Sequence, residues 1–301
     1  MPTPRKLKEL YEQGKNISEF LRKEMNVQYN TQEAIEISYD LQTGSYIACV
    51  EKGEMAIRQD ECSKEIARVI LSLCRPASIL EAGVGEATTL SGVLKHLGGK
   101  ISSYGFDLSW SRVAFAKKWL HANGITNSVL CSGDLFNIPF LDNSIDVVYT
   151  SHSIEPNGGR EEPILRELYR VASKYLVLIE PAYEFANGEA QQRMEHHGYC
   201  KNLRGISVSL GYDVLEHKPF NFTISDPLNP SALTIIRKNN DCVFSPSHVL
   251  ACPKFKTPLK EVGGMMFSPE ALVVYPIIWG IPCLRIENGI FASKYEEVIG
   301  A

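Results

Sequence analysis

The sequence lacks the features that mark several classes of protein. It has no Cys-x-x-Cys pair, and its eight cysteines are scattered at positions 49, 62, 74, 131, 200, 242, 252 and 283. Such scatter gives no disulfide framework and predicts reduced thiols. The chain also has no run of about 18 apolar residues, and its first residues carry charge but no apolar signal core. We therefore expect a cytoplasmic protein that makes no membrane contact.

An excess of positive charge is absent as well. The formal net charge is -4 and the isoelectric point is near 6.0. This balance gives no broad basic field that would attract nucleic acid, so a small-molecule substrate is the simpler expectation. The chain has 301 residues, of which 44% are hydrophobic and 22% charged. That length and composition are enough to bury a large globular core.

The hydrophobic pattern divides the chain into three parts. Residues 1–75 show apolar positions at helical spacing and predict a helical leader or cap. In residues 76–240 short apolar runs alternate with amphipathic stretches, which predicts βαβ units in an α/β, Rossmann-like, doubly wound fold. Its last runs, YDVLEHKPF and SALTIIRKN, complete a mostly parallel seven-stranded sheet as an antiparallel pair. Residues 241–301 are rich in proline and glycine and predict a small β-rich module.

A glycine turn follows the first predicted strand and opens the next helix. It reads Glu81-Ala82-Gly83-Val84-Gly85, and such a turn lets backbone approach a cofactor closely. The third glycine of the dinucleotide pattern is replaced by Thr88, which disfavours a nicotinamide-dependent dehydrogenase. Glu81 would repel a pyrophosphate but would pair with an α-ammonium group. The turn therefore favours an aminoacyl nucleoside such as S-adenosylmethionine.

Two further acids follow at the ends of the next strands. Asp107 in GFDLS lies about 20 residues past the glycines, where an acid accepts hydrogen bonds from ribose hydroxyls. Asp134, between Gly133 and Leu135, could accept from an adenine amino group, with Leu135 against the ring. Each motif alone could instead be a simple turn or a helix cap.

Together, E-x-G-x-G, GFD and GD-x-x-x-IPF-x-D-x-S-x-D resemble the class I S-adenosylmethionine-dependent methyltransferases over roughly residues 60–240. The resemblance implies a transferase with S-adenosyl-L-methionine as its cofactor. The cofactor-binding residues that it implies, together with the residues interpreted above, are Glu81, Gly83, Gly85, Asp107, Leu108, Gly133, Asp134, Leu135 and Ser151.

The methyl acceptor is expected beyond the fourth strand, in the loop Ser151-His152-Ser153-Ile154-Glu155-Pro156-Asn157. Methyl transfer to a hydroxyl needs positioning and removal of a proton. His152 has a suitable pKa for the base, and Glu155 could orient it or bind the acceptor. A purely structural His152 beside the cofactor is the alternative. The residues assigned to the acceptor pocket are Asn157, Glu180, Tyr183 and Glu184; alternatively, Tyr183 packs on the leader and the acids face water.

The C-terminal module carries what looks like a zinc knuckle without its ligands. Cys252 opens a Cys-x-x-Cys position whose second residue is Phe255, and the equivalent second pair is occupied by Ser268 and Ala271. Three of four thiolates are therefore missing, and we predict no metal. The segment VYPIIWGIPCL then resembles the small zinc-ribbon proteins that bind and activate certain methyltransferases, over about residues 248–290.

This resemblance implies an interface, either within the chain or in a homodimer formed through the module. Apolar packing by Phe255, Phe267 and Trp279 would have to replace the metal. The function predicted for the whole chain is methyl transfer to a small polar acceptor, with O-methylation of a sugar or related metabolite favoured. The alternatives are a tRNA or protein methyltransferase and a non-catalytic cofactor-binding scaffold.

Overall fold

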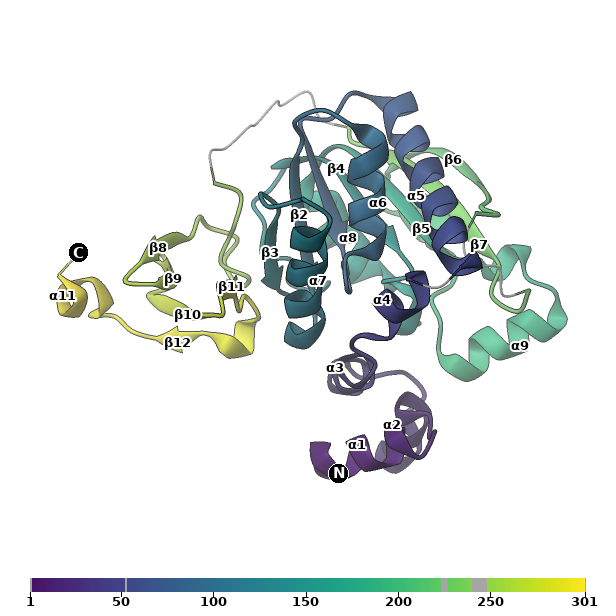
Figure 1. Ribbon diagram of the computed structural model, residues 1–301, viewed down its shortest axis with the longest axis horizontal. Coiled ribbons are helices and arrows are strands. Elements are labelled where there is room, and N and C mark those ends of the chain that lie inside the picture. Colours follow the sequence, from purple (N-terminus) through teal and green to yellow (C-terminus); the bar gives the residue numbers. More distant parts are fainter. Residues whose placement is uncertain (1, 52, 223–226, 240–247, 301) are drawn as a thin grey trace.

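A computed structural model describes residues 2–51, 53–222, 227–239 and 248–300 of the protein (Figure 1). The chain begins with the helices α1 (Pro4–Glu12), α2 (Ile17–Met25), α3 (Gln32–Leu41), α4 (Ser45–Val50) and α5 (Glu54–Leu73). Thr3, Asn16 and Thr31 begin the first three helices, and each side chain accepts a hydrogen bond from a first-turn N–H. Such caps satisfy amide groups that have no partner within the helix.

The central sheet has seven strands in the order β3-β2-β1-β4-β5-β7-β6. Its bounds are β1 (Ser78–Ala82), β2 (Ser102–Asp107), β3 (Val129–Ser132), β4 (Ile145–Ser151), β5 (Ala172–Pro181), β6 (Asp213–Pro219) and β7 (Ser231–Arg237). The strands β1 to β5 run parallel, whereas β7 is antiparallel to both β5 and β6. The predicted fold class and the predicted antiparallel pair are confirmed.

Helices cover both faces of this sheet (Figure 1). Ile79 and Val147 belong to a core that they share with α5, α6 (Thr88–Leu97) and α7 (Trp110–Ala122). Their neighbours Leu80 and Val148 point to the other face, where α8 (Glu161–Val171) packs. Burial on both faces explains why these strands read as continuous apolar runs in the sequence. The helices α9 (Gly188–His197) and α10 (Leu203–Ser209) and the short turns η1 (Glu155–Asn157) and η2 (Tyr183–Phe185) complete the domain.

The leader is shorter than its predicted span of residues 1–75. Ile66 and Ile70 of α5 are fully buried in the same core as α6 and the sheet, so α5 is part of the α/β layer. A separate small core joins α1, α2 and α3 through Leu7, Leu21 and Ala34. The cap therefore consists of α1 to α4, because α5 buries its apolar side against the sheet.

The C-terminal module is a small antiparallel sheet that lies beside the β3 edge of the large one (Figure 1). Its elements are β8 (Lys260–Val262), β9 (Met265–Ser268), β10 (Val273–Ile278), β11 (Ile281–Pro282), η3 (Ile286–Asn288), β12 (Ile290–Phe291) and α11 (Tyr295–Ile299). Cys283 forms a bridge with Ser132 of β3, and the Leu284 N–H donates to the Ser132 carbonyl at 2.9 Å. The module thus packs within its own chain and covers an exposed strand edge.

The packing of the module differs from the expectation. Phe267 is buried, but Phe255 and Trp279 are each 53% exposed, so the predicted apolar packing by those two residues is wrong. Tyr275 takes that place, and its hydroxyl lies 3.4 Å from the sulfur of the buried Cys252. Among the described residues no group of three or more His, Cys, Asp or Glu side chains could hold a metal ion.

None of the helices within the described ranges combines the length and the apolar character needed to cross a membrane.

Candidate active site

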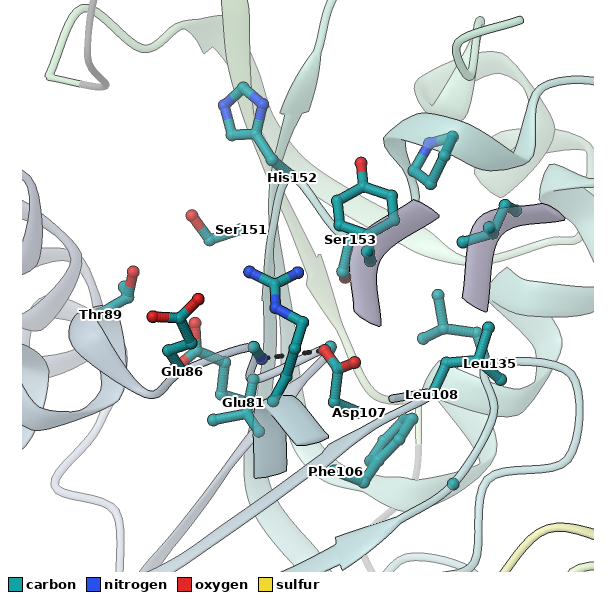
Figure 2. Close-up of a pocket in the computed structure, with 18 of the residues that line it drawn as sticks. Glu81, Glu86, Thr89, Phe106, Asp107, Leu108, Leu135, Ser151, His152 and Ser153 are labelled. Atoms are coloured by element: carbon teal, nitrogen blue, oxygen red, sulfur yellow. Dashed lines mark hydrogen bonds between the residues drawn. The ribbon is translucent and has the colours of Figure 1, made fainter. Parts of the chain in front are cut away.

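A cavity opens at the carboxyl ends of the parallel strands, between the glycine turn and the leader (Figure 2). Residues from four strand ends line it, together with residues of α3, α4 and α7. The lining residues are Gln32, Ile35, Tyr39, Tyr46, Glu81, Gly83, Val84, Gly85, Glu86, Thr88, Thr89, Phe106, Asp107, Leu108, Arg112, Gly133, Leu135, Phe136, Ser151, His152, Ser153, Pro156 and Asn157.

The glycine turn needs residues without a side chain. Gly83 has a φ of +75°, and a Cβ built on it would lie 2.2 Å from the Cβ of Ser153. Gly85 has a φ of +52°, and its N–H donates to the Asp107 carboxylate at 2.9 Å. Both conformations favour glycine, and any larger residue at position 83 would require Ser153 to move. The turn brings backbone to the cavity wall as the sequence predicts.

Asp107 is held in place at the end of β2. One carboxylate oxygen accepts from the Gly85 N–H and the other from the Ser109 N–H, each at 2.9 Å. Asp107, which is predicted to bind the ribose, and Leu108, which is predicted to contact the cofactor, both line the cavity. Asp134 does not: its carboxylate accepts from the Phe136 N–H at 2.5 Å and holds the turn after β3. Of the three residues predicted at the turn after β3, Gly133 and Leu135 line the cavity and Asp134 does not.

Glu81 lies in the wall of the cavity and is 2% exposed. It accepts a hydrogen bond from the Tyr149 hydroxyl at 3.0 Å. Burial raises the pKa of Glu81 to about 8, although the hydrogen bonds from Tyr149 and the Leu90 backbone act in the opposite direction. At pH 7 Glu81 is therefore mostly a neutral acid, whereas the sequence predicts a carboxylate at this position.

The leader closes over the glycine turn through contacts that the sequence argument did not identify. The Glu86 carboxylate accepts from the Gly44 and Ile47 N–H groups, each at 2.9 Å, at the start of α4. The Ser109 hydroxyl donates to Asp40 at 2.6 Å. The partners in these hydrogen bonds are about 40 or more residues apart in the sequence. The one signal in the sequence that could have identified them is the position of Glu86 and Ser109 beside the glycine turn and Asp107.

On the acceptor side, His152 and Glu155 form a dyad. His152 Nδ1 lies 2.5 Å from a Glu155 oxygen, and Nε2 lies 3.0 Å from the Ser231 hydroxyl. Burial acts to lower the pKa of His152, but the adjacent Glu155 outweighs it, so the pKa lies above the ordinary value of a histidine. His152 lines the cavity, and Glu155 stands behind it. Ser231 begins β7, and the antiparallel direction of β7 brings it to this edge.

Glu180 holds the loop that carries this dyad. It is 1% exposed and accepts hydrogen bonds from the N–H groups of Ser153, Ile154 and Glu155 at 3.0, 3.2 and 3.0 Å. Burial raises the pKa of Glu180 to about 7, while His152 acts to lower it. Its side chain does not line the cavity, which corrects its assignment to the acceptor pocket: Glu180 acts on the loop backbone.

The other residues predicted for the acceptor pocket do not lie together. Asn157 lines the cavity. The Tyr183 hydroxyl donates to Glu195 at 2.9 Å, and Glu184 pairs with His217 at 2.8 Å. Neither Tyr183 nor Glu184 reaches the cavity wall, because η2 turns away from the sheet after β5. Of the residues predicted for the acceptor side, His152 and Asn157 are the ones that line the cavity, and both belong to the segment after β4.

A seven-stranded sheet with one antiparallel strand, a glycine turn after β1 and an acid after β2 define a Rossmann-like cofactor-binding domain. Residues 79–174 match the family model described as a methyltransferase domain. The chain therefore contains a methyltransferase domain.

Two relatives match different lengths of the chain. Norajmaline N-methyltransferase from Rauvolfia serpentina is 31% identical over 114 residues, which is 38% of this chain and 38% of that protein. The chain thus spans well under half of that relative. A UPF0434 protein from Vesicomyosocius okutanii is 39% identical over 49 residues, which is 16% of this chain and 83% of that protein. A segment of this chain therefore belongs to the family of that UPF0434 protein.

Among solved structures, the fold is similar to that of magnesium protoporphyrin IX methyltransferase from Synechocystis PCC 6803 with bound SAH. The TM-score is 0.54 at 12% identity, and the similarity covers 69% of this chain and 100% of that one. At this identity the likeness establishes the fold.

Proposed function

We propose that this protein transfers the methyl group of S-adenosylmethionine to a hydroxyl of a small polar acceptor, such as a sugar or a related metabolite. The observation that carries the proposal is the His152–Glu155 dyad at the wall of the cofactor cavity, with a hydroxyl already 3.0 Å from His152 Nε2. The shape of the turn supports the cofactor, because Gly83 and Gly85 adopt positive φ angles and bring backbone directly to the cavity wall.

Glu81 and Asp107 are the residues that would hold the ammonium group and the ribose of the cofactor, with Leu108 and Leu135 beside the adenine. When bound, S-adenosylmethionine supplies a sulfonium-activated methyl group, which leaves sulfur as it bonds to the acceptor oxygen. The protein must then position that oxygen and take its proton.

His152 is suited to take the proton at Nε2. Its Nδ1 contacts Glu155, which favours the neutral tautomer with hydrogen on Nδ1 and leaves Nε2 as the acceptor atom. Nε2 contacts the buried Ser231 hydroxyl, so an acceptor hydroxyl in the cavity would have to replace this contact to donate to Nε2. When the acceptor O–H bond breaks, its proton goes to Nε2, and Glu155 stabilises the imidazolium that results. His152 then releases the proton to solvent.

We infer further that the 49 residues shared with the UPF0434 protein lie in the C-terminal module and that this module binds no zinc. Its exposed apolar residues Ile290 and Phe291, 58% and 72% exposed on β12, support a homodimer formed through the module. The net charge of -4 favours a small-molecule partner over nucleic acid or a membrane surface. The cysteines within the described residues are all free thiols, which supports a cytoplasmic location.

The proposal is tested with purified full-length protein, S-adenosylmethionine and a panel of monosaccharides, glycosides and small amines, with S-adenosylhomocysteine release as the readout. We expect product with at least one hydroxyl acceptor, and a loss of about 100-fold or more in His152→Ala, as for removal of a general base. The matched control is His121→Ala, an exposed histidine on α7. Failure of the wild-type protein to bind S-adenosylhomocysteine, or activity only with amine acceptors, would contradict the proposal.

A further inference from the structure

A buried arginine lies in the wall of the cavity and has no carboxylate partner among the residues that the structure describes. Arg112, in the first turn of α7, is 6% exposed, and its guanidinium lies 4.5 Å from the ring centroid of Tyr46 and 5.3 Å from that of Tyr39. A Cβ added to Gly85 would lie 3.0 Å from Arg112 Nη2. The cation therefore lies directly against the backbone of the glycine turn, with two tyrosines of the leader around it.

The charge of Arg112 is not matched at close range. Within the part of the chain that the structure describes, no carboxylate oxygen lies within 4.0 Å of its guanidinium, and its Nε has no hydrogen-bond partner. The nearest acids, Asp107 and Glu86, are already engaged by backbone N–H groups. A buried cation in this state is costly unless a ligand completes its hydrogen bonding.

The charges of the whole cavity indicate which ligand group this is. Among the described residues that line it, Arg112 is the one arginine or lysine, whereas Glu81, Glu86 and Asp107 are acids. S-adenosylmethionine carries an ammonium group, a sulfonium and a single carboxylate. The acids complement its positive groups, and the carboxylate needs a cation that can form paired hydrogen bonds, as a guanidinium does.

We propose that Arg112 binds the carboxylate of the methionine end of the cofactor, an inference that rests on the cofactor in the proposed function. Tyr39 and Tyr46 hold the guanidinium in place through their ring faces. Because these tyrosines belong to α3 and α4, carboxylate binding also links the cofactor to the leader. Occupancy of the cofactor site should therefore stabilise the leader as well as the turn.

The test compares two ligands that differ in that carboxylate alone: S-adenosylhomocysteine and its decarboxylated analogue, S-adenosyl-3-thiopropylamine. Calorimetric titration of the full-length wild-type protein should give tighter binding of S-adenosylhomocysteine. In Arg112→Gln its dissociation constant should rise on the order of 10- to 100-fold, the effect of losing a charge-assisted hydrogen-bonded pair. The dissociation constant of the analogue should change less than about threefold, because it never used the guanidinium.

Arg58→Gln, which changes an exposed arginine of α5, is the control and should alter neither constant. Arg112→Lys keeps the charge and should restore part of the loss. Hydrogen exchange in α3 and α4 should slow with S-adenosylhomocysteine and remain unchanged with the analogue. Equal weakening of both ligands by Arg112→Gln would assign the residue a structural role and overturn the inference, as would no weakening of either.

The proposed function fails in a different way. If the wild-type protein binds neither ligand, the cofactor assignment is wrong, and this inference falls with it. If the wild-type protein binds both but Arg112→Gln does not distinguish them, the cofactor assignment stands and the role of Arg112 alone is refuted.

Discussion

Glu81 predicts that cofactor binding releases a proton. Burial raises the pKa of this carboxyl to about 8, so at pH 7 only about one molecule in ten carries the carboxylate before the ligand binds. An ammonium group at this position binds the ionised form better and stabilises it. Binding at pH 7 should therefore be about tenfold weaker than with Glu81 fully ionised, a difference of about 1.4 kcal/mol.

The assay is calorimetric titration of S-adenosylhomocysteine at half-unit steps from pH 6 to pH 8. Below a pKa of about 8, each unit of decreasing pH should raise the dissociation constant about tenfold, because one proton must leave Glu81 for each ligand bound. Titrations at pH 7 in two buffers of different ionisation enthalpy should show release of roughly 0.9 proton per ligand, the fraction of Glu81 that is protonated at that pH.

Glu81→Gln keeps the shape of the side chain and removes the titration. It should bind more weakly at pH 8 and lose both the pH dependence and the proton release assigned to this residue. The reasoning is refuted if the wild-type dissociation constant varies less than about threefold between pH 6 and pH 8, or if Glu81→Gln retains the wild-type dependence.

Three further predictions test the turn and the dyad. In denaturant titrations, Gly83→Ala should lose about 1–3 kcal/mol more folding stability than Gly14→Ala. Both glycines have φ near +80°, but a Cβ would meet Ser153 at position 83 and nothing within 4 Å at position 14. Glu180→Gln should slow methyl transfer at least about tenfold and change the affinity for S-adenosylhomocysteine less than about threefold, because it removes the charge that holds the loop after β4. Equal losses of methyl-transfer rate and of affinity would contradict this. Glu155→Gln should move the acid limb of kcat/KM to lower pH, because Glu155 holds the pKa of His152 above its ordinary value; an unmoved limb would exclude His152 as the base.

The cofactor side of the site was predictable because its signals are local. Gly83 and Gly85 follow β1 directly, and Asp107 ends β2, so a strand-end position and a few neighbouring residues were enough to place them. Asp134 shows the limit of this reasoning. Its strand-end position was predicted correctly, but its side chain turns back to the Phe136 N–H, and no sequence pattern fixes that rotamer.

The acceptor side depends on contacts between distant segments, which a single sequence does not encode in a readable pattern. Ser231 meets His152 across 79 positions, and only because β7 enters the sheet antiparallel to β5. Arg112 has an ordinary helical position in the sequence, and it becomes notable only when the leader places two tyrosine rings on it. Residues of this kind require the assembled fold.

The C-terminal module is connected to the wall of the cavity through backbone hydrogen bonds. Leu284 donates to the carbonyl of Ser132, and the next residue, Gly133, donates its own N–H to the carbonyl of Asp107, each at 2.9 Å. The module's edge is thus two hydrogen bonds from the acid that would hold the ribose. Because Gly133 lines the cavity, any shift of the module at the β3 edge changes the cavity wall. The covering of this edge therefore stabilises the turn after β3 as well as the sheet.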